Sequence, residues 1–428
     1  MLINNQLRLS ITYLALALFS APMASAEAVS TSMSKLEVQP KAQAETQISP
    51  EIFAQCIERF KAEASKRQIS EGVINTDLAK VSISPRVLEL DRQQPEFTST
   101  FADYLNKRVT LARVEKGRKL LREHSVLLNK VADRYGISPP YLLAFWGLET
   151  NFGGYLGRMS TLNSLATLGC DERRSTYFTG ELMAALTLID EGSVTSDLLK
   201  GSWAGAMGHV QFMPSTYLRY AVDYDGDGKR DLWGSLPDAM ASAANLLAAL
   251  DWNKGERWGR EVSLPKDFAY LEAGLNNRRT LGAWRKLGVR NADGSALPQA
   301  DMEAALLIPA GHKGPAFLVY HNFDVIMGWN KSEFYAIAIG YMANRIAGMG
   351  KILTPPPEDA PHLHRDDVIQ LQQRLVEDGF SDETPDGILG PQTRLAIRKF
   401  QAKNGLIADG FPSQTVLAAL GVSLSPRE

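Results

Sequence analysis

A proline-rich segment near the C-terminal end divides this chain into two parts that we expect to fold separately. Residues 353–361 read Leu-Thr-Pro-Pro-Pro-Glu-Asp-Ala-Pro, and proline, which lacks a backbone N–H and fixes φ, cannot continue a helix there. We therefore predict a large domain over residues 50–348, a linker over 349–363 and a small module over 364–422. With 428 residues, 45% of them hydrophobic, the chain is long enough to give both parts a core.

The N-terminal end has the layout of an export signal. Arg8 supplies a positive start, residues 11–19 form a short apolar run, and Ala-Ser-Ala at 24–26 is a small-residue cleavage site. We expect a signal peptide over residues 1–26 and a flexible polar leader over 27–49. Because the apolar run is well short of the roughly 20 residues that span a bilayer, cleavage is preferred to an uncleaved anchor. The mature chain is then expected in the periplasm without a membrane span, and secretion beyond the cell is the alternative.

Two cysteines, Cys56 and Cys170, are far apart in the sequence. In an oxidising compartment one disulfide between them is the preferred interpretation. Two buried free thiols are the alternative, because sequence alone does not show that the two Cα atoms come within bridging range. Neither cysteine has a histidine or a second cysteine at metal-ligand spacing.

Apolar residues recur at helical spacing through most of the large domain. The pattern starts at Phe53, Cys56 and Phe60 and continues through an amphipathic run from Tyr104 to Leu128. Further helices are predicted over residues 141–148, 176–191, 214–221, 236–250 and 335–346. Shorter apolar runs and turn residues between 255 and 320 allow some β structure. The expected fold class is mainly α, with a small β-containing region in the large domain.

Two segments carry candidate chemistry. Glu149 ends an apolar helix in Trp-Gly-Leu-Glu-Thr-Asn-Phe-Gly, and such surroundings disfavour the charged carboxylate, as a general acid near neutral pH requires. A helix-terminal glutamate that caps or forms a salt bridge is the alternative. The glycine-rich segment 201–215 places Ser202 and Gln211 where they can hydrogen-bond sugar hydroxyl or amide groups.

Together these two segments resemble the lytic murein transglycosylase B family, and the resemblance covers nearly all of residues 50–348. It implies a lysozyme-like helical catalytic domain with a small β-containing region. It also implies that Glu149 is the catalytic acid and base and that Ser202 and Gln211 line the substrate groove.

A later stretch, residues 320–335, resembles the family's Tyr-Asn-x-Ser-x-x-Tyr segment. Asn330 and Tyr335 carry over directly as groove residues. Trp329 stands where a tyrosine is usual, so stacking on a sugar ring is retained, whereas its part in hydrogen bonding is left open. Tyr104 falls where the family places a groove tyrosine.

The resemblance also implies a reaction. Two-carboxylate glycosidases need a second acid, and none is embedded in these segments. Glu149 is expected to protonate the glycosidic oxygen between N-acetylmuramic acid and N-acetylglucosamine, with assistance from the N-acetyl group, and then to deprotonate the C6 hydroxyl. The product is a 1,6-anhydromuramic acid end, and no organic cofactor is needed. A hydrolytic muramidase and a non-catalytic peptidoglycan-binding scaffold are the alternatives.

Residues 223–231 match the first nine positions of an EF-hand loop, including the glycine at position 6. The match predicts a structural Ca²⁺, and a metal-free Asp-Gly-rich turn is the alternative. A single loop argues against a calcium sensor. Gly234 replaces the usual glutamate at position 12, and the resemblance suggests Asp238 in its place. The expected ligands are Asp223, Asp225, Asp227, the backbone carbonyl of Lys229, and Asp238.

The C-terminal module has two helical patterns, a shorter third, and a repeated Asp-Gly turn at residues 386–393 and 409–415. It resembles the three-helix peptidoglycan-binding domain of cell-wall enzymes, and a small helical domain without that role is the alternative. Peptidoglycan glycan strands are therefore the expected partner. The formal net charge of −2 gives no basic excess for binding nucleic acid.

Overall fold

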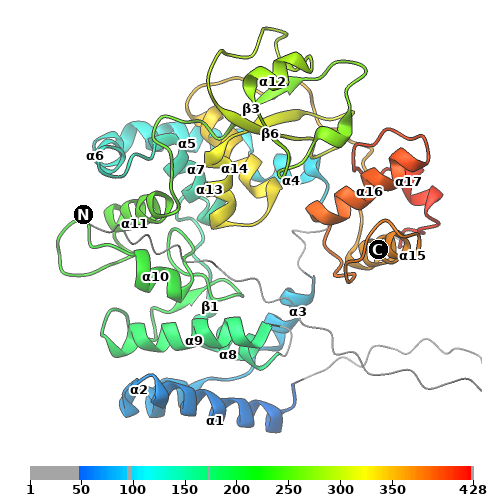
Figure 1. Cartoon of the computed structure of the whole chain (residues 1–428). Helices are drawn as coiled ribbons and strands as arrows, with labels where there is room; N and C mark the ends of the chain where they lie inside the picture. The colour runs from blue at the N-terminus through cyan, green and yellow to red at the C-terminus, as the bar shows by residue number, and fades with distance from the viewer. Residues whose placement is uncertain (1–47, 94–98, 172–173, 426–428) are drawn as a thin grey trace, which may run out of the picture. The chain divides into compact units, whose positions relative to one another are not determined.

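The computed structural model describes residues 48–93, 99–171 and 174–425 (Figure 1). The predicted signal peptide and all but the last two residues of the predicted leader lie outside the described residues. Helices predominate and the sheets are small, which confirms the expected mainly α fold class. Within the described ranges, we find no helix that combines the length and the apolar character needed to cross a membrane.

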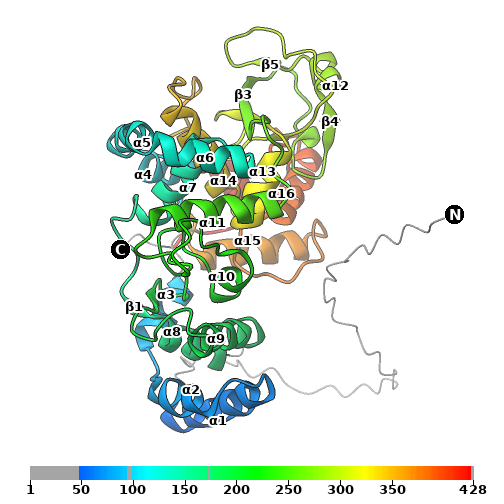
Figure 2. The same ribbon diagram turned by 90° about the vertical axis from the view of Figure 1, so that its left-hand side faces the viewer.

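The N-terminal helices pack against two helices from the middle of the chain, α8 and α9. Serine side chains cap two of them, since Ser49 accepts from Ile52 N and Ser70 accepts from Val73 N. The first helix packs against helices α8 and α9 (Figure 2), and its buried side chains include Phe53 and Phe60. The elements are α1 (Pro50–Lys66), α2 (Glu71–Thr76), η1 (Leu78–Lys80), α3 (Pro85–Gln93), β1 (Met159–Ser160), α8 (Thr161–Cys170) and α9 (Ser175–Asp190).

Helix α7 (Pro139–Thr150) lies at the centre of the large domain. Proline at its first position follows Ser138, and nearly all of its side chains are buried, so that it has no solvent-facing stripe. Its neighbours are α5 (Leu111–Glu123), α6 (Ser125–Tyr135) and α14 (Glu333–Ile346).

The predicted run from Tyr104 to Leu128 is three helices rather than one, because the chain restarts at capping residues. Thr110 accepts from Arg113 N at the start of α5, and the chain turns again at His124 before α6. The first of the three is α4 (Phe101–Arg108), with Val109 as the residue that follows its last turn. The large domain also contains β2 (Lys200–Gly201), α10 (Pro214–Tyr220), α11 (Leu236–Ala249) and α13 (His321–Trp329).

The β structure expected between residues 255 and 320 is a five-stranded antiparallel sheet of order β4-β6-β7-β3-β5. It has a hydrophobic core of its own, which includes the fully buried Trp284, Leu306 and Leu318. The elements are β3 (Gly259–Ser263), η4 (Tyr270–Glu272), β4 (Arg278–Thr280), α12 (Leu281–Lys286), β5 (Arg290–Asn291), β6 (Glu303–Leu307) and β7 (Ala316–Val319).

The C-terminal module consists of α15 (Arg365–Glu377), α16 (Pro391–Lys403) and α17 (Gln414–Ala419) around a separate core. A glutamine in each of the first two helices holds one of the repeated turns. Gln372 Oε1 accepts from Gly387 N at 2.8 Å, and Gln401 Oε1 accepts from Gly410 N at 2.7 Å. The repeated turn is therefore explained by buried amide hydrogen bonds, which satisfy backbone donors inside the module.

Candidate active site

Glu149 lies in the last turn of α7, half-buried among buried neighbours. The helix stops abruptly, because Asn151 (φ 52°) and Phe152 (φ 58°) both adopt the left-handed conformation. A side chain at Gly153 is excluded, since its Cβ would lie 2.4 Å from the His209 ring. Because the helix ends here, the Glu149 side chain lies at the edge of the buried core and is partly exposed.

One carboxyl oxygen of Glu149 receives two hydrogen bonds from aromatic side chains. Trp329 Nε1 donates to Glu149 Oε1 at 3.0 Å, and the Tyr335 hydroxyl donates to the same oxygen. Burial, followed by the charge of Glu149, raises the pKa of Tyr335 well above its usual value, so this hydroxyl keeps its proton. Trp329, whose part in hydrogen bonding the sequence left open, supplies a donor here.

Aromatic rings surround this carboxyl group. The Trp329 ring lies 4.5 Å from that of Phe145 and 5.5 Å from that of Phe212, measured between centroids. Tyr104, from α4, is buried and close enough to Tyr335 to raise the pKa of its hydroxyl further. The structure thus brings Tyr104, Trp329 and Tyr335 together with Glu149, as the resemblance implied.

The glycine-rich segment lies against the same end of α7. Thr150 Oγ1 donates to the His209 carbonyl at 2.9 Å, and Trp146 Nε1 donates to His209 Nδ1 at 3.0 Å. Burial lowers the pKa of His209, which favours the neutral ring that this acceptor role requires. His209 lies within the recognised motif, yet nothing in its residue type predicted that it ties the loop to the catalytic helix.

Ser202 and Gln211 hold the conformation of their own loop. Ser202 Oγ accepts from Ala206 N at 3.1 Å, and Gln211 Nε2 donates to the carbonyls of Gly208 and Leu156 at 3.0 and 3.2 Å. Both side chains are partly exposed. Both residues belong to the loop that contacts α7 through His209, and their contact with a sugar stays a proposal.

A buried acid that the sequence reasoning missed fixes the far end of this loop. Glu181, on α9, is 5% exposed and accepts from both the backbone N and the hydroxyl of Ser215, at 2.9 and 2.7 Å. Ser215 is the second residue of α10, whose start follows the loop directly. The helical periodicity of α9 gave no signal for this role, because the partner lies 34 positions away.

The carboxylates of Asp223, Asp225 and Asp227 converge in the EF-hand-like loop, with one oxygen of each within 4.8 Å of the others. Three close carboxylates repel each other unless a cation compensates them, and oxygen donors suit a hard cation such as Ca²⁺. Asp238 lies next to this loop, and its role as a ligand stays a prediction. It is fully buried, and its oxygens accept from the backbone N atoms of Tyr224, Asp225 and Asp231, so it braces the loop.

The two cysteines lie near each other in the core but are not bonded in the structure. Arg59 Nη2 is 3.6 Å from Cys56 Sγ and donates to the carbonyl of Gly169 at 3.1 Å, which places α1 beside the end of α8. Both thiols are buried. Burial and the adjacent Cys56 thiol raise the pKa of Cys170.

Comparison with protein-family models gives two matches. Residues 52–344 match a family described as "Transglycosylase SLT domain". Residues 364–420 match one described as "Putative peptidoglycan binding domain".

Several known proteins are similar to this chain. A crystal structure of SltB3 from Pseudomonas aeruginosa in complex with NAG-anhNAM-pentapeptide is 42% identical, covers 86% of this chain and 99% of its own, and has a TM-score of 0.82. The Escherichia coli transglycosylase Slt35 in complex with calcium is 29% identical over 68% of this chain and 92% of its own, with a TM-score of 0.60.

One relative of known sequence is the membrane-bound lytic murein transglycosylase B of Escherichia coli K12. It is 32% identical over 260 residues, or 57% of this chain, and the match spans 66% of that protein's length.

Proposed function

The chain belongs to the transglycosylase SLT-domain family, and on that premise we propose that it is a lytic transglycosylase of peptidoglycan. It cleaves the β-1,4 bond between N-acetylmuramic acid and N-acetylglucosamine and leaves 1,6-anhydromuramic acid ends. The observation that carries the proposal is the Glu149 carboxyl group, held by Trp329 and Tyr335 at the end of a buried helix.

In this mechanism Glu149 acts twice. As an acid, it passes its proton to the glycosidic oxygen while the bond to C1 of the muramic acid breaks. The N-acetyl group of the same sugar supports the developing positive charge at C1, in the role that a second carboxylate has in two-carboxylate enzymes. As a base, Glu149 then takes the proton of the C6 hydroxyl, whose oxygen closes the anhydro ring on C1. Because two donors already fix the carboxyl group, little orientation remains to be ordered in the transition state.

The remaining site residues are proposed to hold the glycan. Ser202 and Gln211 present polar groups from the glycine-rich loop, Tyr104 and Trp329 present rings, and Asn330 adjoins Trp329 in the turn before α14. We assign the catalytic domain to residues 50–348 and a peptidoglycan-binding role to residues 364–422. Tethering raises the effective concentration of the enzyme on an insoluble wall.

Three further assignments belong to this proposal. The EF-hand-like loop binds a structural Ca²⁺, which is supported by the converging carboxylates and by the relative solved with calcium. Residues 1–26 direct the chain to the periplasm. In that compartment Cys56 and Cys170, which lie close together, form a disulfide.

Mass spectrometry of muropeptides released from purified peptidoglycan tests the reaction, with the mature chain and Glu149→Gln compared side by side. Products one water lighter than reducing-end muropeptides, made by the native chain and lost with Glu149→Gln, are expected. Reducing ends identify a hydrolytic muramidase instead. If neither protein releases muropeptides, the chain is a non-catalytic peptidoglycan-binding scaffold.

A further inference from the structure

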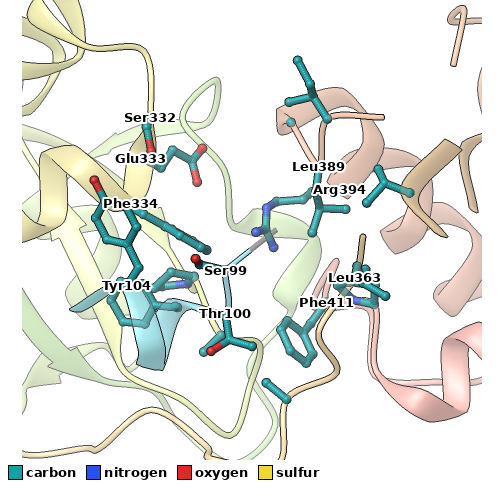
Figure 3. A pocket seen from close by; sticks show the side chains of 18 of the residues that line it. Ser99, Thr100, Tyr104, Ser332, Glu333, Phe334, Leu363, Leu389, Arg394 and Phe411 are labelled. Atoms are coloured by element: carbon teal, nitrogen blue, oxygen red, sulfur yellow. The ribbon is translucent and has the colours of Figure 1, made fainter. Parts of the chain in front are cut away.

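A cavity of about 350 Å³ lies between the large domain and the C-terminal module (Figure 3). One wall comes from the start of α4 and the turn before α14, and the other comes from the linker and α16. Much of the lining is apolar, including Phe101, Phe334, Leu363, Leu389 and Phe411. A volume of this size is in the range of ordinary ligand sites.

Arg394 of α16 projects its guanidinium into this cavity (Figure 3). The side chain is 9% exposed, and its Cζ atom lies 6.0 Å from the centre of the Phe334 ring. In the part of the chain that the structure describes, this guanidinium has no hydrogen-bond acceptor and no carboxylate oxygen within 4.0 Å. A guanidinium stays charged in proteins, and a buried charge without a close partner is costly.

Arg394 and Arg398 lie near two acids, Glu333 and Asp409, whose charges favour the charged form of both arginines. Arg398, one turn further along α16, is 7% exposed, and its Nε atom has no partner among the described residues. Burial raises the pKa of Glu333, the half-buried acid on the opposite wall, although both arginines pull the other way. Asp409 is already engaged by His312, whose Nδ1 lies 2.6 Å away, and by Gln401 at 2.7 Å.

The cavity adjoins the candidate active site. Tyr104 and Asn330 line it, and the resemblance places both residues in the substrate groove. Glu333, at the start of α14, is two residues before Tyr335, whose hydroxyl contacts Glu149. A group attached to the reacting sugar is therefore within reach of the cavity.

We propose that this interdomain cavity binds the peptide stem of peptidoglycan, with the Arg394 guanidinium pairing with a carboxylate of the stem. The inference rests on the proposed function, because the stem reaches the cavity as a branch of the N-acetylmuramic acid residue that is cut. Peptide carboxylates match the two parallel donors of an arginine, and the small aliphatic groups of a stem match the apolar walls. Residues of the same cavity then contact both the glycan strand and its peptide branch.

Direct binding is the first test, and it needs no cleavage. We expect the free pentapeptide stem to bind the full-length native chain saturably in isothermal titration calorimetry. Arg394→Gln should weaken binding about tenfold or more, as expected for the loss of a charge-assisted pair. The matched control is Arg374→Gln, an exposed arginine of the same module, which should bind as the native chain does. An analogue with every carboxylate converted to the amide should not bind.

Absence of saturable binding to the native chain overturns the inference, as does equal binding of the amide analogue. If acetate at matched ionic strength displaces the pentapeptide, the cavity binds an adventitious anion only, and this result also overturns the inference. Arg394→Lys keeps the charge but loses the paired donors, so intermediate affinity is expected. Thermal unfolding of each variant checks that the module is still folded.

Kinetics then separate stem recognition from module docking. We expect the ratio of kcat/KM on stem-bearing glycan to that on stem-free glycan to fall about tenfold in Arg394→Gln, mainly through KM. An equal loss on both substrates means that Arg394 only docks the module, and the inference fails. If the native chain cuts neither glycan, the proposed function fails, whereas stem binding is still decided by calorimetry.

Discussion

At the scale of single residues, Tyr335 and Trp329 decide how the Glu149 carboxyl group is presented. Both donate to the same carboxyl oxygen, and together they restrict the rotation of the Glu149 side chain. The tryptophan replaces a tyrosine that is usual in the family, and the structure shows that the indole N–H preserves a donor at this position. The hydrogen bond is therefore retained, and stacking on a sugar ring stays a prediction.

Tyr335→Phe removes one of these donors without changing the ring. We expect kcat for muropeptide release to fall about 10²-fold, since single preorganised donors in active sites are worth that much, while KM changes little. Trp329→Phe is the matched variant, because it removes the other donor and leaves a ring to stack. An unchanged kcat in Tyr335→Phe shows that the hydroxyl does not orient the acid.

Glu333 gives the chain a specific pH dependence. Burial raises the pKa of its carboxyl above 4.5, so the folded chain binds more protons than the unfolded chain between the two pKa values. The free energy of unfolding contributed by this group is therefore full below pH 4.5 and falls as pH rises through the folded pKa. Glu333→Gln lacks this titration.

Denaturant unfolding at a series of pH values checks this expectation. The Glu333→Gln variant should be more stable than the native chain at about pH 8, and the two should converge in acid. A constant difference across the range contradicts the raised pKa.

At the scale of elements, the glycine-rich loop is held at two points, in its middle and at its last residue, by side chains from helices. His209 joins it to α7, and Glu181 joins its last residues to α9 through Ser215. The loop is irregular, but these contacts tie its middle to α7 and its last residue to α9. These contacts add to the hydrogen bonds that Ser202 and Gln211 make within the loop itself.

Glu181→Gln tests the second of these anchors. Replacing the carboxylate weakens two hydrogen bonds at the start of α10, and we expect a loss of about 1 to 3 kcal/mol in the free energy of unfolding, together with a lower kcat. Glu123→Gln, an exposed acid of α5 that lies 3.6 Å from Lys119, should change stability by less than about 0.5 kcal/mol. A full retention of stability in Glu181→Gln contradicts the anchoring role.

Binding of Ca²⁺ to the EF-hand-like loop should stabilise the folded chain. Calcium at about 100 times its Kd is expected to add about 2.7 kcal/mol to the free energy of unfolding, and excess chelator should remove the gain. Asp225→Asn should abolish the response, whereas Asp197→Asn, an exposed aspartate outside the loop, should retain it. Scanning calorimetry with and without the ion measures both, and a native chain that is insensitive to calcium contradicts the site.

At the scale of the whole molecule, one covalent bond is expected between helices distant in the sequence. Cys56 and Cys170 lose two hydrogen atoms together to a thiol–disulfide exchange partner in an oxidising compartment. Closing a loop of roughly a hundred residues is worth about 4 to 5 kcal/mol. The intact mass of exported protein should be lower by two hydrogens, and reduction should lower its stability to that of Cys56→Ser. An unchanged mass means that the thiols stay free.

Sequence reasoning worked where the signal was local. Periodicity predicted most helices, and the segments around Glu149, Trp329 and Tyr335 identified residues that the structure places side by side. It failed where distant residues meet. The partnership of Glu181 with Ser215 and the position of Arg394 opposite Glu333 depend on tertiary packing, which leaves no spacing pattern along the chain. The backbone hydrogen bonds that Asp238 accepts from Tyr224 and Asp231 depend on tertiary packing in the same way.

The paired glutamines of the C-terminal module have a practical consequence. Gln372 donates to Asp386, 14 positions ahead of it, whereas Gln401 donates to Asp409, only 8 positions ahead, and the two turns have the same Asp-Gly form. The connection between Gln372 and Asp386 is thus longer than the one between Gln401 and Asp409. Its residues 382–384 are exposed. A fluorescent or affinity tag inserted there gives a handle for following the protein in living cells while leaving the glutamine-held turn intact.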